Sequence, residues 1–445
     1  MRYFIAKSRH LDSKGMIQMP RTPYCPTYAT NQPNLPNLPN LPPKPPLLVA
    51  EISANHNQNL ALALQTIESA KRAGADFVKL QTYTPDSLTI DCSAPCFVID
   101  SGTAWDGQTL YELYKQAYTP FEWHAELFAH ARAMGIGIFS SPFCARGVEL
   151  LESLDCPMYK IASFEITDIA LISLVASTHK PIIISTGIAT HELIVEAIEA
   201  CHRVGNSDIT LLHCVSEYPA KLEEANILAM PSLARYGVKY GLSDHTIGTN
   251  ESDRGCADLC AILAASLGAS MIEKHFIISR SLGGVDSHFS MEEAEFATMA
   301  SRVRAVGVAM GSKGIENVGS QNVENIDNVA NVENVDFSNV DLTMPKNAPK
   351  SKKSTHSHST TNTKNKPKNH TISQDEITAY KPKSPFARSL FVCEDIAKGE
   401  VLDMQNIRSI RPSDGLPPKF LPKILGAKAT RDLKRGEPLK IGDFE

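Results

Sequence analysis

The chain has 445 residues, a length typical of two or three domains when each domain takes about 150 residues. Its formal net charge of −5 provides no broad basic field, which argues against non-specific binding of nucleic acid. No stretch approaches the roughly 18 consecutive apolar residues of a membrane span, and residues 1–21 hold no apolar run of signal-peptide length. We therefore expect a cytoplasmic protein that acts on neither nucleic acid nor a membrane.

The first segment, residues 1–46, is rich in proline. The triplet Asn-Leu-Pro occurs three times in succession over residues 34–42. Because each proline fixes φ and lacks an N–H group, this repeat predicts a polyproline-like stretch without a packed core. We interpret residues 1–46 as a disordered N-terminal segment.

Short apolar runs alternate with amphipathic stretches of helix length over residues 47–312, which is typical of repeated βα units. One such stretch is 60–73, where Leu60, Leu64 and Ile67 share one face at helical spacing. Eight strands, each followed by a helix, in about 265 residues predict a (β/α)8 TIM barrel. An open doubly wound sheet is the alternative, but no glycine-rich phosphate loop follows the first strand. The expected strands are 47–52, 76–81, 136–140, 158–162, 181–185, 209–213, 239–243 and 271–276.

The remainder of the chain divides into two segments. Residues 313–383 combine a degenerate Asn-Val repeat with a tract of Lys, Ser, Thr, Asn and His. This composition cannot bury enough apolar surface to offset the loss of chain entropy, so we expect a disordered low-complexity linker. Residues 384–445 show short apolar runs separated by glycine and proline, which predicts a small β-rich domain.

Polar side chains stand at or just beyond the end of every expected strand. In a TIM barrel the carboxyl ends of the strands form the rim of the active site. A single polar strand end has an ordinary structural explanation, but eight together predict an enzyme. The residues concerned are Glu51; Lys79 and Gln81; Ser140 and Ser141; Lys160, Ser163 and Glu165; Ser185 and Thr186; His213; Asp244 and His245; Glu273 and His275.

The residue types at these strand ends indicate the chemistry. Ammonium and hydroxyl groups donate hydrogen bonds, so Lys79, Lys160, Ser141, Ser163 and Ser185 favour a ligand that carries a phosphate and a carboxylate. His245 and His275, on adjacent strands, are candidate ligands for a divalent metal. Glu51 and Glu273 are candidates for proton transfer or for support of the metal site. Together these groups suggest carbon–carbon bond chemistry on a small substrate.

Several motifs in chain order resemble the sialic acid synthase family. They are AEISANHNQ (50–58), KLQTYTPD (79–86), FSSPF (139–143), YKIASFEITD (159–168), IISTGIAT (183–190), LLHCVSEYP (211–219), GLSDHTIG (241–248) and EKHF (273–276). The resemblance implies condensation of phosphoenolpyruvate with an N-acetylated deoxy sugar. The variants NHNQNL, QTYTPD, SFEITD and SIRP are most similar to the members that make pseudaminic acid. Members that make N-acetylneuraminic or legionaminic acid are the alternatives, and a non-catalytic sugar-binding barrel is the alternative from another functional class.

The same resemblance assigns roles to individual residues. It implies that His245 and His275 hold a divalent metal ion (Mn, Mg or Co). It places Lys79, Ser141, Lys160, Ser163 and Ser185 at the phosphoenolpyruvate site, and Glu51, Gln81, Glu165, Tyr218, Glu273 and Asp286 at catalytic or sugar-binding positions. Of these, we expect Glu51, Lys79 and Glu273 to be catalytic. Ser141 stands where some members have Thr, and Ser216 where some have Asn.

Residues 384–445 resemble the antifreeze-like (SAF) domain of the same family through FARSLFVCEDIAKGE and SIRP. In the family this domain covers the barrel of the partner subunit in a domain-swapped homodimer and contributes an arginine to the sugar site. The resemblance therefore implies a homodimer and assigns that arginine to Arg411. The non-catalytic alternative predicts loss of Glu51, a metal histidine or a phosphate-side lysine, and all of them are present.

Overall fold

A computed structural model describes residues 45–103, 105–247, 256–310, 384 and 386–445. The expected N-terminal segment, apart from residues 45–46, and the whole expected linker at 313–383 lie outside these residues.

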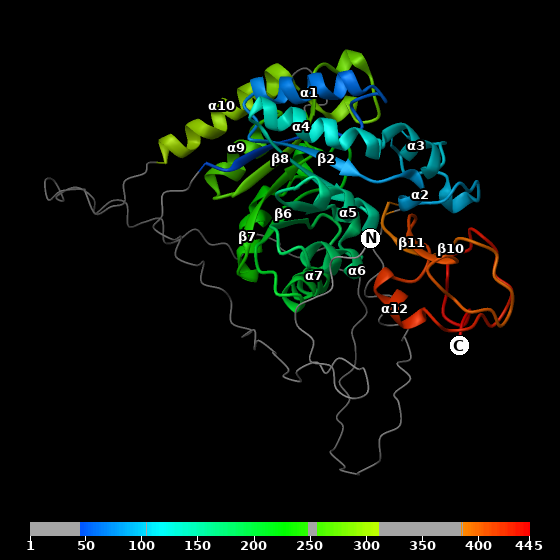
Figure 1. The fold of residues 1–445 in the computed structure, drawn as a ribbon. Helices are drawn as coiled ribbons and strands as arrows, with labels where there is room; N and C mark the ends of the chain where they lie inside the picture. Colours follow the sequence, from blue (N-terminus) through cyan, green and yellow to red (C-terminus); the bar gives the residue numbers. More distant parts are fainter. Residues whose placement is uncertain (1–44, 104, 248–255, 311–383, 385) are drawn as a thin grey trace, which may run out of the picture. The chain divides into compact units, whose positions relative to one another are not determined.

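Eight parallel strands form a closed barrel (Figure 1). Each strand pairs with the next along the chain, and β8 pairs with β1 to complete the ring. The predicted TIM barrel is therefore confirmed, with every strand within two residues of its expected bounds. The strands are β1 (Leu47–Glu51), β2 (Phe77–Thr82), β3 (Gly137–Pro142), β4 (Tyr159–Ile161), β5 (Ile182–Ser185), β6 (Ile209–His213), β7 (Lys239–Asp244) and β8 (Met271–Ile277).

Helices cover the outside of the barrel (Figure 1). The expected first helix is present, and its start is fixed by Asn59, whose side chain accepts a hydrogen bond from the backbone N–H of Leu62. Two further helices, α2 and α3, are inserted between β2 and α4. The helices are α1 (Leu60–Arg72), α2 (Pro85–Leu88), α3 (Leu110–Ala117), α4 (His124–Met134), α5 (Ala145–Ser153), α6 (Ile169–Ala176), α7 (His191–Arg203), α9 (Leu259–Ser266) and α10 (Glu293–Ala309).

The sixth unit differs from the expected strand–helix pattern. After β6 the chain forms a ten-residue 3-10 run, Ile227–Tyr236, in place of an α-helix. Pro231 lies inside this run, and a proline in a helix interior lacks the N–H group and clashes with the preceding turn. The expectation of an α-helix after every strand is therefore wrong at this position.

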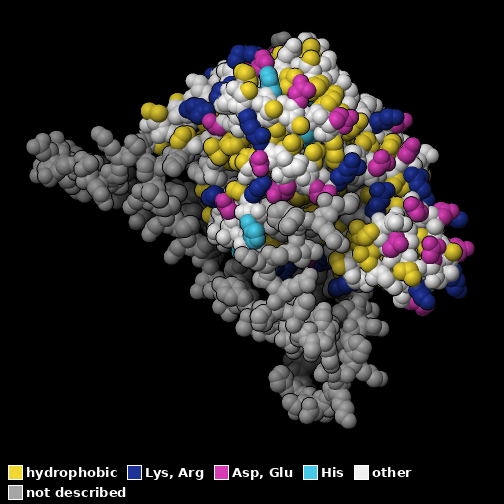
Figure 2. Space-filling model, in the orientation of Figure 1, with side chains coloured by type: hydrophobic (Ala, Val, Ile, Leu, Met, Phe, Trp, Pro, Cys, Tyr) yellow, Lys and Arg dark blue, Asp and Glu magenta, His cyan; other side chains and the backbone are white. Residues whose placement is uncertain are grey.

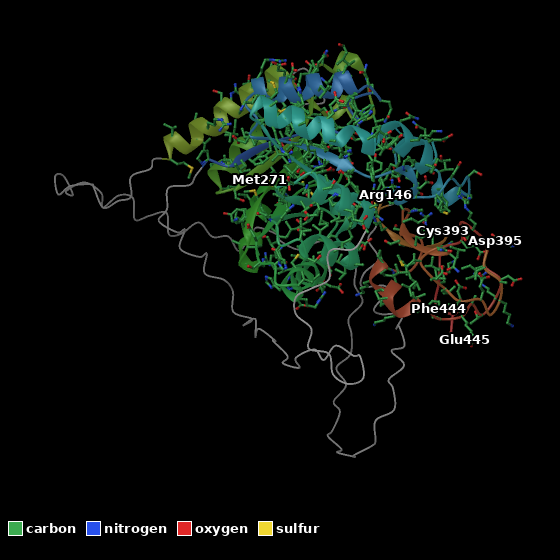
Figure 3. All side chains as sticks on the ribbon, viewed as in Figure 1. Arg146, Met271, Cys393, Asp395, Phe444 and Glu445 are labelled. Carbon is green, nitrogen blue, oxygen red and sulfur yellow. The ribbon has the colours of Figure 1, made fainter. Side chains whose placement is uncertain are left out.

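Register places the polar side chains of the rim side by side. In the strand register, Glu51 of β1 is the partner of Lys79 on β2 and of His275 on β8, and Gln81 of β2 is the partner of Ser141 on β3. The alternate residues on the strands, such as Val78 and Leu80, are buried in the large apolar cluster beneath the helices. Side chains occupy the space between the strands and the surrounding helices (Figure 3).

The C-terminal residues form a small domain with its own core. Strands β10 (Ser389–Val392) and β11 (Ile407–Ile410) are antiparallel, and the short helix α12 (Leu421–Ile424) follows them. Buried Leu390, Ile407 and Phe420 belong to an apolar cluster separate from that of the barrel. Cys393 and Phe444, labelled in Figure 3, lie in this domain. The expected small β-rich domain is confirmed.

Charges of both signs are interspersed on the face drawn in Figure 2, without a broad field of one sign. Among the described residues, no helix combines the length and the apolar character that a membrane crossing requires.

Candidate active site

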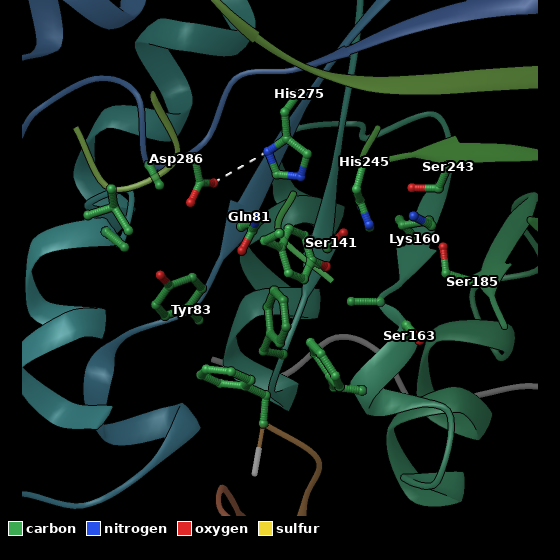
Figure 4. Close-up of a pocket in the computed structure, with 18 of the residues that line it drawn as sticks. Gln81, Tyr83, Ser141, Lys160, Ser163, Ser185, Ser243, His245, His275 and Asp286 are labelled. Atoms are coloured by element: carbon green, nitrogen blue, oxygen red, sulfur yellow. Dashed lines mark ion pairs between the residues drawn. The ribbon is translucent and has the colours of Figure 1, made fainter. Parts of the chain in front are cut away.

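A pocket opens at the carboxyl ends of the strands and encloses roughly 900 Å³ between atoms, part of it open to solvent. Predicted site residues that line it are Lys79, Gln81, Ser141, Lys160, Ser163, Ser185, Tyr218, His245, Glu273, His275, Asp286 and Arg411. Figure 4 shows Lys160 and Ser185 on one side of this pocket and Tyr83 on the other. Glu51 and Glu165 are buried beside the pocket and do not line it.

Two lysines and two glutamates form a buried charge cluster at one end of the pocket. Lys79 pairs with Glu51 and lies 3.6 Å from Glu273, and Lys160 lies 3.1 Å from Glu273. Burial alone would raise the pKa of Glu273, but the ammonium groups of Lys160 and Lys79 hold this pKa at about 2. Burial lowers the pKa of Lys160, against the opposing pull of Glu273. The cluster thus brings two carboxylates and two ammonium groups together, and the lowered pKa keeps Glu273 ionised between the lysines.

Serine hydroxyl groups surround this cluster. The buried hydroxyls of Ser141 and Ser185 have no hydrogen-bond partner among the described residues. The hydroxyl of Ser163 accepts hydrogen bonds from the backbone N–H of Ile188 at 3.0 Å and from the hydroxyl of Ser216 at 2.9 Å. Because buried polar groups are normally hydrogen-bonded, the two free hydroxyls indicate a ligand with acceptor oxygens at this end.

The paired histidines lie next to the charge cluster. The His245 and His275 ring centroids are 5.5 Å apart, and the His245 Nδ1 atom lies 2.6 Å from the carbonyl oxygen of Val215. His275 Nδ1 lies 3.4 Å from Asp286, as the dashed line in Figure 4 shows. The contact with Val215 orients the His245 ring through Nδ1, whereas His275 Nδ1 lies near Asp286 without forming a hydrogen bond. An imidazole held through Nδ1 can offer its Nε2 atom to a metal ion.

The protonation state of His245 also suits metal binding. Burial, reinforced by the neighbouring His275, lowers the pKa of His245 to about 3, so its imidazole is neutral at pH 7. A neutral imidazole is the form that binds a divalent ion. Among the described residues, no group of three or more His, Cys, Asp or Glu side chains could hold a metal ion.

The opposite end of the pocket is lined largely by aromatic rings. Trp105 contributes its ring and satisfies its indole N–H through a 3.1 Å hydrogen bond to the carbonyl oxygen of Val285. The ring of Phe386, from the C-terminal domain, packs 5.9 Å from that of Trp105. Aromatic residues that line this end are Tyr83, Trp105, Tyr114, Phe143, Phe164 and Phe386.

Arg411 reaches this end of the pocket from the C-terminal domain. It donates to Glu165 Oε1 at 2.6 Å and to the hydroxyl of Tyr114 at 3.1 Å. Its Nε group is buried and has no partner among the residues that the structure describes. Arg411 therefore keeps one free N–H donor at the position that the family resemblance assigns to sugar binding. The carboxylate of Glu165 is its ion partner.

Several residues of the pocket are not predicted from the sequence. Ser243, in β7, donates to Glu273 Oε1 at 3.0 Å, and its position two residues before His245, which follows β7, is the period-two signal that points to it. Tyr83 lies inside a recognised motif, but nothing in its spacing marks it as part of the pocket. Trp105 and Phe386 come from a loop and from the second domain, so only the tertiary structure brings them together.

Some strand-end residues face away from the pocket. The hydroxyl of Ser140 bonds to that of Thr82 at 2.6 Å, and His213 Nε2 lies 2.9 Å from the carbonyl oxygen of Ala225. Asp244 pairs with Lys274 at 2.7 Å on the outer side of the barrel wall. Ser216 supports Ser163 from behind and does not line the pocket.

Comparison with known proteins places these features in a family. The NeuB family profile matches residues 66–314, and the SAF domain profile matches residues 387–445. Pseudaminic acid synthase from Helicobacter pylori is 47% identical over 89% of this chain and 97% of that protein. Pseudaminic acid synthase from Campylobacter jejuni is 38% identical over 89% of this chain and 96% of that protein.

A solved structure agrees with these relationships. The spore coat polysaccharide biosynthesis protein SpsE of Bacillus subtilis is 25% identical with a TM-score of 0.61, covering 90% of this chain and 95% of that one. Sequence, barrel, second domain and pocket thus agree, and the chain belongs to the NeuB family, with a C-terminal SAF domain.

Proposed function

We propose that this protein is a cytoplasmic transferase that makes pseudaminic acid. The reaction condenses phosphoenolpyruvate, water and 2,4-diacetamido-2,4,6-trideoxy-L-altrose to give pseudaminic acid and phosphate. The observation that carries the proposal is one pocket with two chemically distinct ends, a Lys–Ser end and an aromatic–Arg411 end, and two histidines in its lining. The relatives reported above bear the corresponding name.

The Lys–Ser end suits phosphoenolpyruvate. Lys79 and Lys160 offer ammonium charge, and Ser141 and Ser185 offer free hydroxyl donors to phosphate or carboxylate oxygens. The proposal requires that carbon 3, the nucleophilic carbon, faces the bound sugar, and donors at fixed positions can impose that orientation before any bond forms.

The aromatic end suits the deoxy sugar. The proposed acceptor carries two acetamido methyl groups and a methyl carbon 6, and the rings of Tyr83, Trp105 and Phe386 provide apolar surface for such groups. Arg411 Nε is free to donate to an acetamido oxygen or a hydroxyl. A sugar with a 6-hydroxyl group gains less from burial against these rings.

The bond changes balance without a further reactant. Carbon 3 of phosphoenolpyruvate bonds to the aldehyde carbon of the open-chain sugar, whose oxygen takes up a proton. Water adds to carbon 2, and the carbon–oxygen bond to phosphate then breaks. Glu51, which accepts hydrogen bonds from the Ser53 N–H at 3.1 Å and from Gln81 at 3.4 Å, is the carboxylate that we propose finally accepts the proton of this water. Because Glu51 does not line the pocket, its ion partner Lys79, which does, would stand between the two.

His245 and His275 would hold the divalent ion (Mn, Mg or Co), which when bound polarises a carbonyl oxygen as a Lewis acid. Burial keeps the His245 imidazole neutral, and the carbonyl oxygen of Val215 orients its ring, while the carboxylate of Asp286 lies 3.4 Å from His275 Nδ1. Tyr218, whose ring lies 4.3 Å from that of His245, covers one face of this imidazole.

We also propose a homodimer in which each SAF domain covers the barrel of its partner. In the described chain the SAF domain contacts the barrel of the same chain, and the residues that join them, 311–383, lie outside the description. The same contacts serve when two chains exchange domains, because they involve only surfaces of the barrel and of the SAF domain.

The substrate assignment is tested with the purified protein. Phosphoenolpyruvate and Mn²⁺ are supplied with the L-altrose derivative, with N-acetylmannosamine, or with the sugar that gives legionaminic acid. Phosphate release and product mass are measured for each. We expect the highest kcat/KM with the L-altrose derivative; faster turnover with either other sugar reassigns the product, and no turnover with any favours the non-catalytic sugar-binding alternative.

A further inference from the structure

The SAF domain brings a second arginine to the barrel, Arg388, whose side chain is 3% exposed. Its Nε donates to Glu165 Oε1 at 3.1 Å, and its two terminal nitrogens donate to the carbonyl oxygens of Ser409 at 2.8 Å and Phe143 at 2.9 Å. All three nitrogens are therefore occupied. Arg388 does not line the pocket, so it has no direct access to a substrate.

Glu165 connects Arg388 to Arg411. The Oε1 atom of Glu165 accepts from both guanidinium groups, while Oε2 is buried without a hydrogen-bond partner among the described residues. The terminal torsion of a glutamate has a broad energy minimum, so one hydrogen bond leaves its carboxylate free to turn. The second guanidinium removes that freedom and keeps Oε1 directed at Arg411.

Arg388 acts on a second neighbour of Arg411 as well. The guanidinium carbon of Arg411 lies 5.7 Å from the ring centroid of Phe143 and 5.4 Å from that of Phe164. The hydrogen bond from Arg388 to the Phe143 carbonyl oxygen fixes the residue that carries one of these rings. The ion partner and one aromatic neighbour of Arg411 are thus both held by Arg388.

We propose that Arg388 is a positioning residue for sugar binding, which aligns Glu165 and Phe143 so that Arg411 presents its free Nε group to the acceptor sugar. This inference rests on the proposed function in one respect, namely that Arg411 serves the sugar end of the pocket. It makes Glu165 part of the support of Arg411, in place of the direct substrate contact expected from the sequence.

The test compares Arg388→Gln with Arg408→Gln in the full-length, metal-loaded enzyme, using whichever acceptor sugar the wild type converts. Arg408 is the matched control, because it lies in the same domain and donates to a barrel carbonyl oxygen, that of Asp86, at 2.8 Å without touching Glu165. For Arg388→Gln we expect the KM of the sugar to rise by roughly 10- to 100-fold while the KM of phosphoenolpyruvate stays within about twofold. For Arg408→Gln both values stay within about twofold.

A double variant distinguishes two roles of Arg388: positioning of Arg411 through Glu165, and general attachment of the SAF domain to the barrel. If Arg388 acts through the carboxylate, Arg388→Gln adds little to the sugar KM once Glu165→Gln is present. Fully additive effects, equal increases in both KM values, or an unchanged sugar KM would each overturn the inference. Should Arg388→Gln not fold, Arg388→Lys keeps the charge but cannot make all three hydrogen bonds, and the same selective rise in the sugar KM is expected. A wrong substrate assignment shows in the wild type itself, whereas a wrong assignment of Arg388 shows only among the variants.

Discussion

Glu273 is the residue on which the charge balance of the pocket depends. It lies 3.1 Å from Lys160 and 3.6 Å from Lys79, and all three side chains are almost fully buried. Without a ligand, the carboxylates of Glu51 and Glu273 pair with the two ammonium groups. The lysines that a phosphate or carboxylate would contact are therefore buried and held in place before a ligand arrives.

Glu273→Gln should therefore destabilise the ligand-free protein, because it leaves two buried ammonium groups with one carboxylate. We expect a loss of about 3–5 kcal/mol in the free energy of unfolding, the usual cost of breaking a buried ion pair from one side. Inorganic phosphate should restore part of that loss, since an anion between the lysines replaces the missing charge. Thermal unfolding with and without phosphate measures both effects.

The control for this variant is Asp208→Asn, which removes a surface ion pair with Lys239, where the two side chains are 47% and 63% exposed. We expect a loss of no more than about 1 kcal/mol for it, and no added response to phosphate. Equal losses in the free energy of unfolding would show that the buried Lys–Glu pairs stabilise the fold no more than the exposed ion pair does.

At the scale of single elements, the sequence predicts the strands better than their surroundings. Strand ends such as Lys79 and His275 are predictable because period-two alternation and parallel register decide which side chains converge. Pro231 shows the limit within one element, because the run that contains it is 3-10 where an α-helix is expected. Arg388 and Trp105 could not be predicted as parts of the site, because their partners lie far away in sequence and are set by tertiary packing.

The joint between β2, β3 and α4 contains a buried hydrogen-bond network. His124 is the first residue of α4, and its Nε2 atom lies 2.8 Å from the hydroxyl of Thr82, while Nδ1 lies 3.0 Å from the carbonyl oxygen of Pro120. Thr82 bonds in turn to Ser140. Burial lowers the pKa of His124 to about 4.

This pKa makes stability depend on pH in a defined window. Between about pH 6.5 and pH 4 the unfolded chain binds a proton at His124 that the folded chain does not, so the free energy of unfolding falls as the pH falls. The slope approaches about 1.4 kcal/mol per pH unit for one such group, and above pH 6.5 the contribution is constant. His124→Gln should reduce the slope between pH 6.5 and pH 4.5, as followed by urea unfolding at several pH values.

The matching control is His202→Gln in α7, because His202 is exposed at the protein surface. That variant should keep the wild-type dependence of the urea midpoint on pH. An unchanged slope in His124→Gln would mean that the folded protein binds this proton as readily as the unfolded chain does, so that burial does not lower the pKa of His124.

At the scale of the whole molecule, the SAF domain is attached to the barrel around the segment that follows β2. The backbone N–H of Arg411 donates to the carbonyl oxygen of Leu88 at 2.8 Å, and the Thr89 hydroxyl donates to the carbonyl oxygen of Arg411 at 2.9 Å. The rings of Phe97 and Phe391 pack with centroids 5.1 Å apart. Phe386 and Arg411 of the SAF domain line the pocket, so the pocket is complete only with this domain attached, whichever chain supplies it.

Co-expression of two inactive variants tests which chain supplies it. Glu51→Ala damages the barrel but leaves Arg411 intact, and Arg411→Ala does the reverse, so each variant alone should be nearly inactive. If SAF domains are exchanged, a mixed dimer has one site with both lesions and one site with neither. Random pairing then restores roughly a quarter of wild-type sites in a two-fold dimer.

Attachment within one chain predicts a different result, because every site in a mixed dimer then carries one lesion and no activity returns. The comparison requires that the mixed species be purified through two different affinity tags and that its size be confirmed as dimeric by light scattering. The background is the activity measured when the two variants are purified separately and then mixed under conditions in which they do not exchange subunits. In the purified mixed dimer, activity near one half of the wild-type value per site supports the exchanged dimer, and activity at the background level would contradict it.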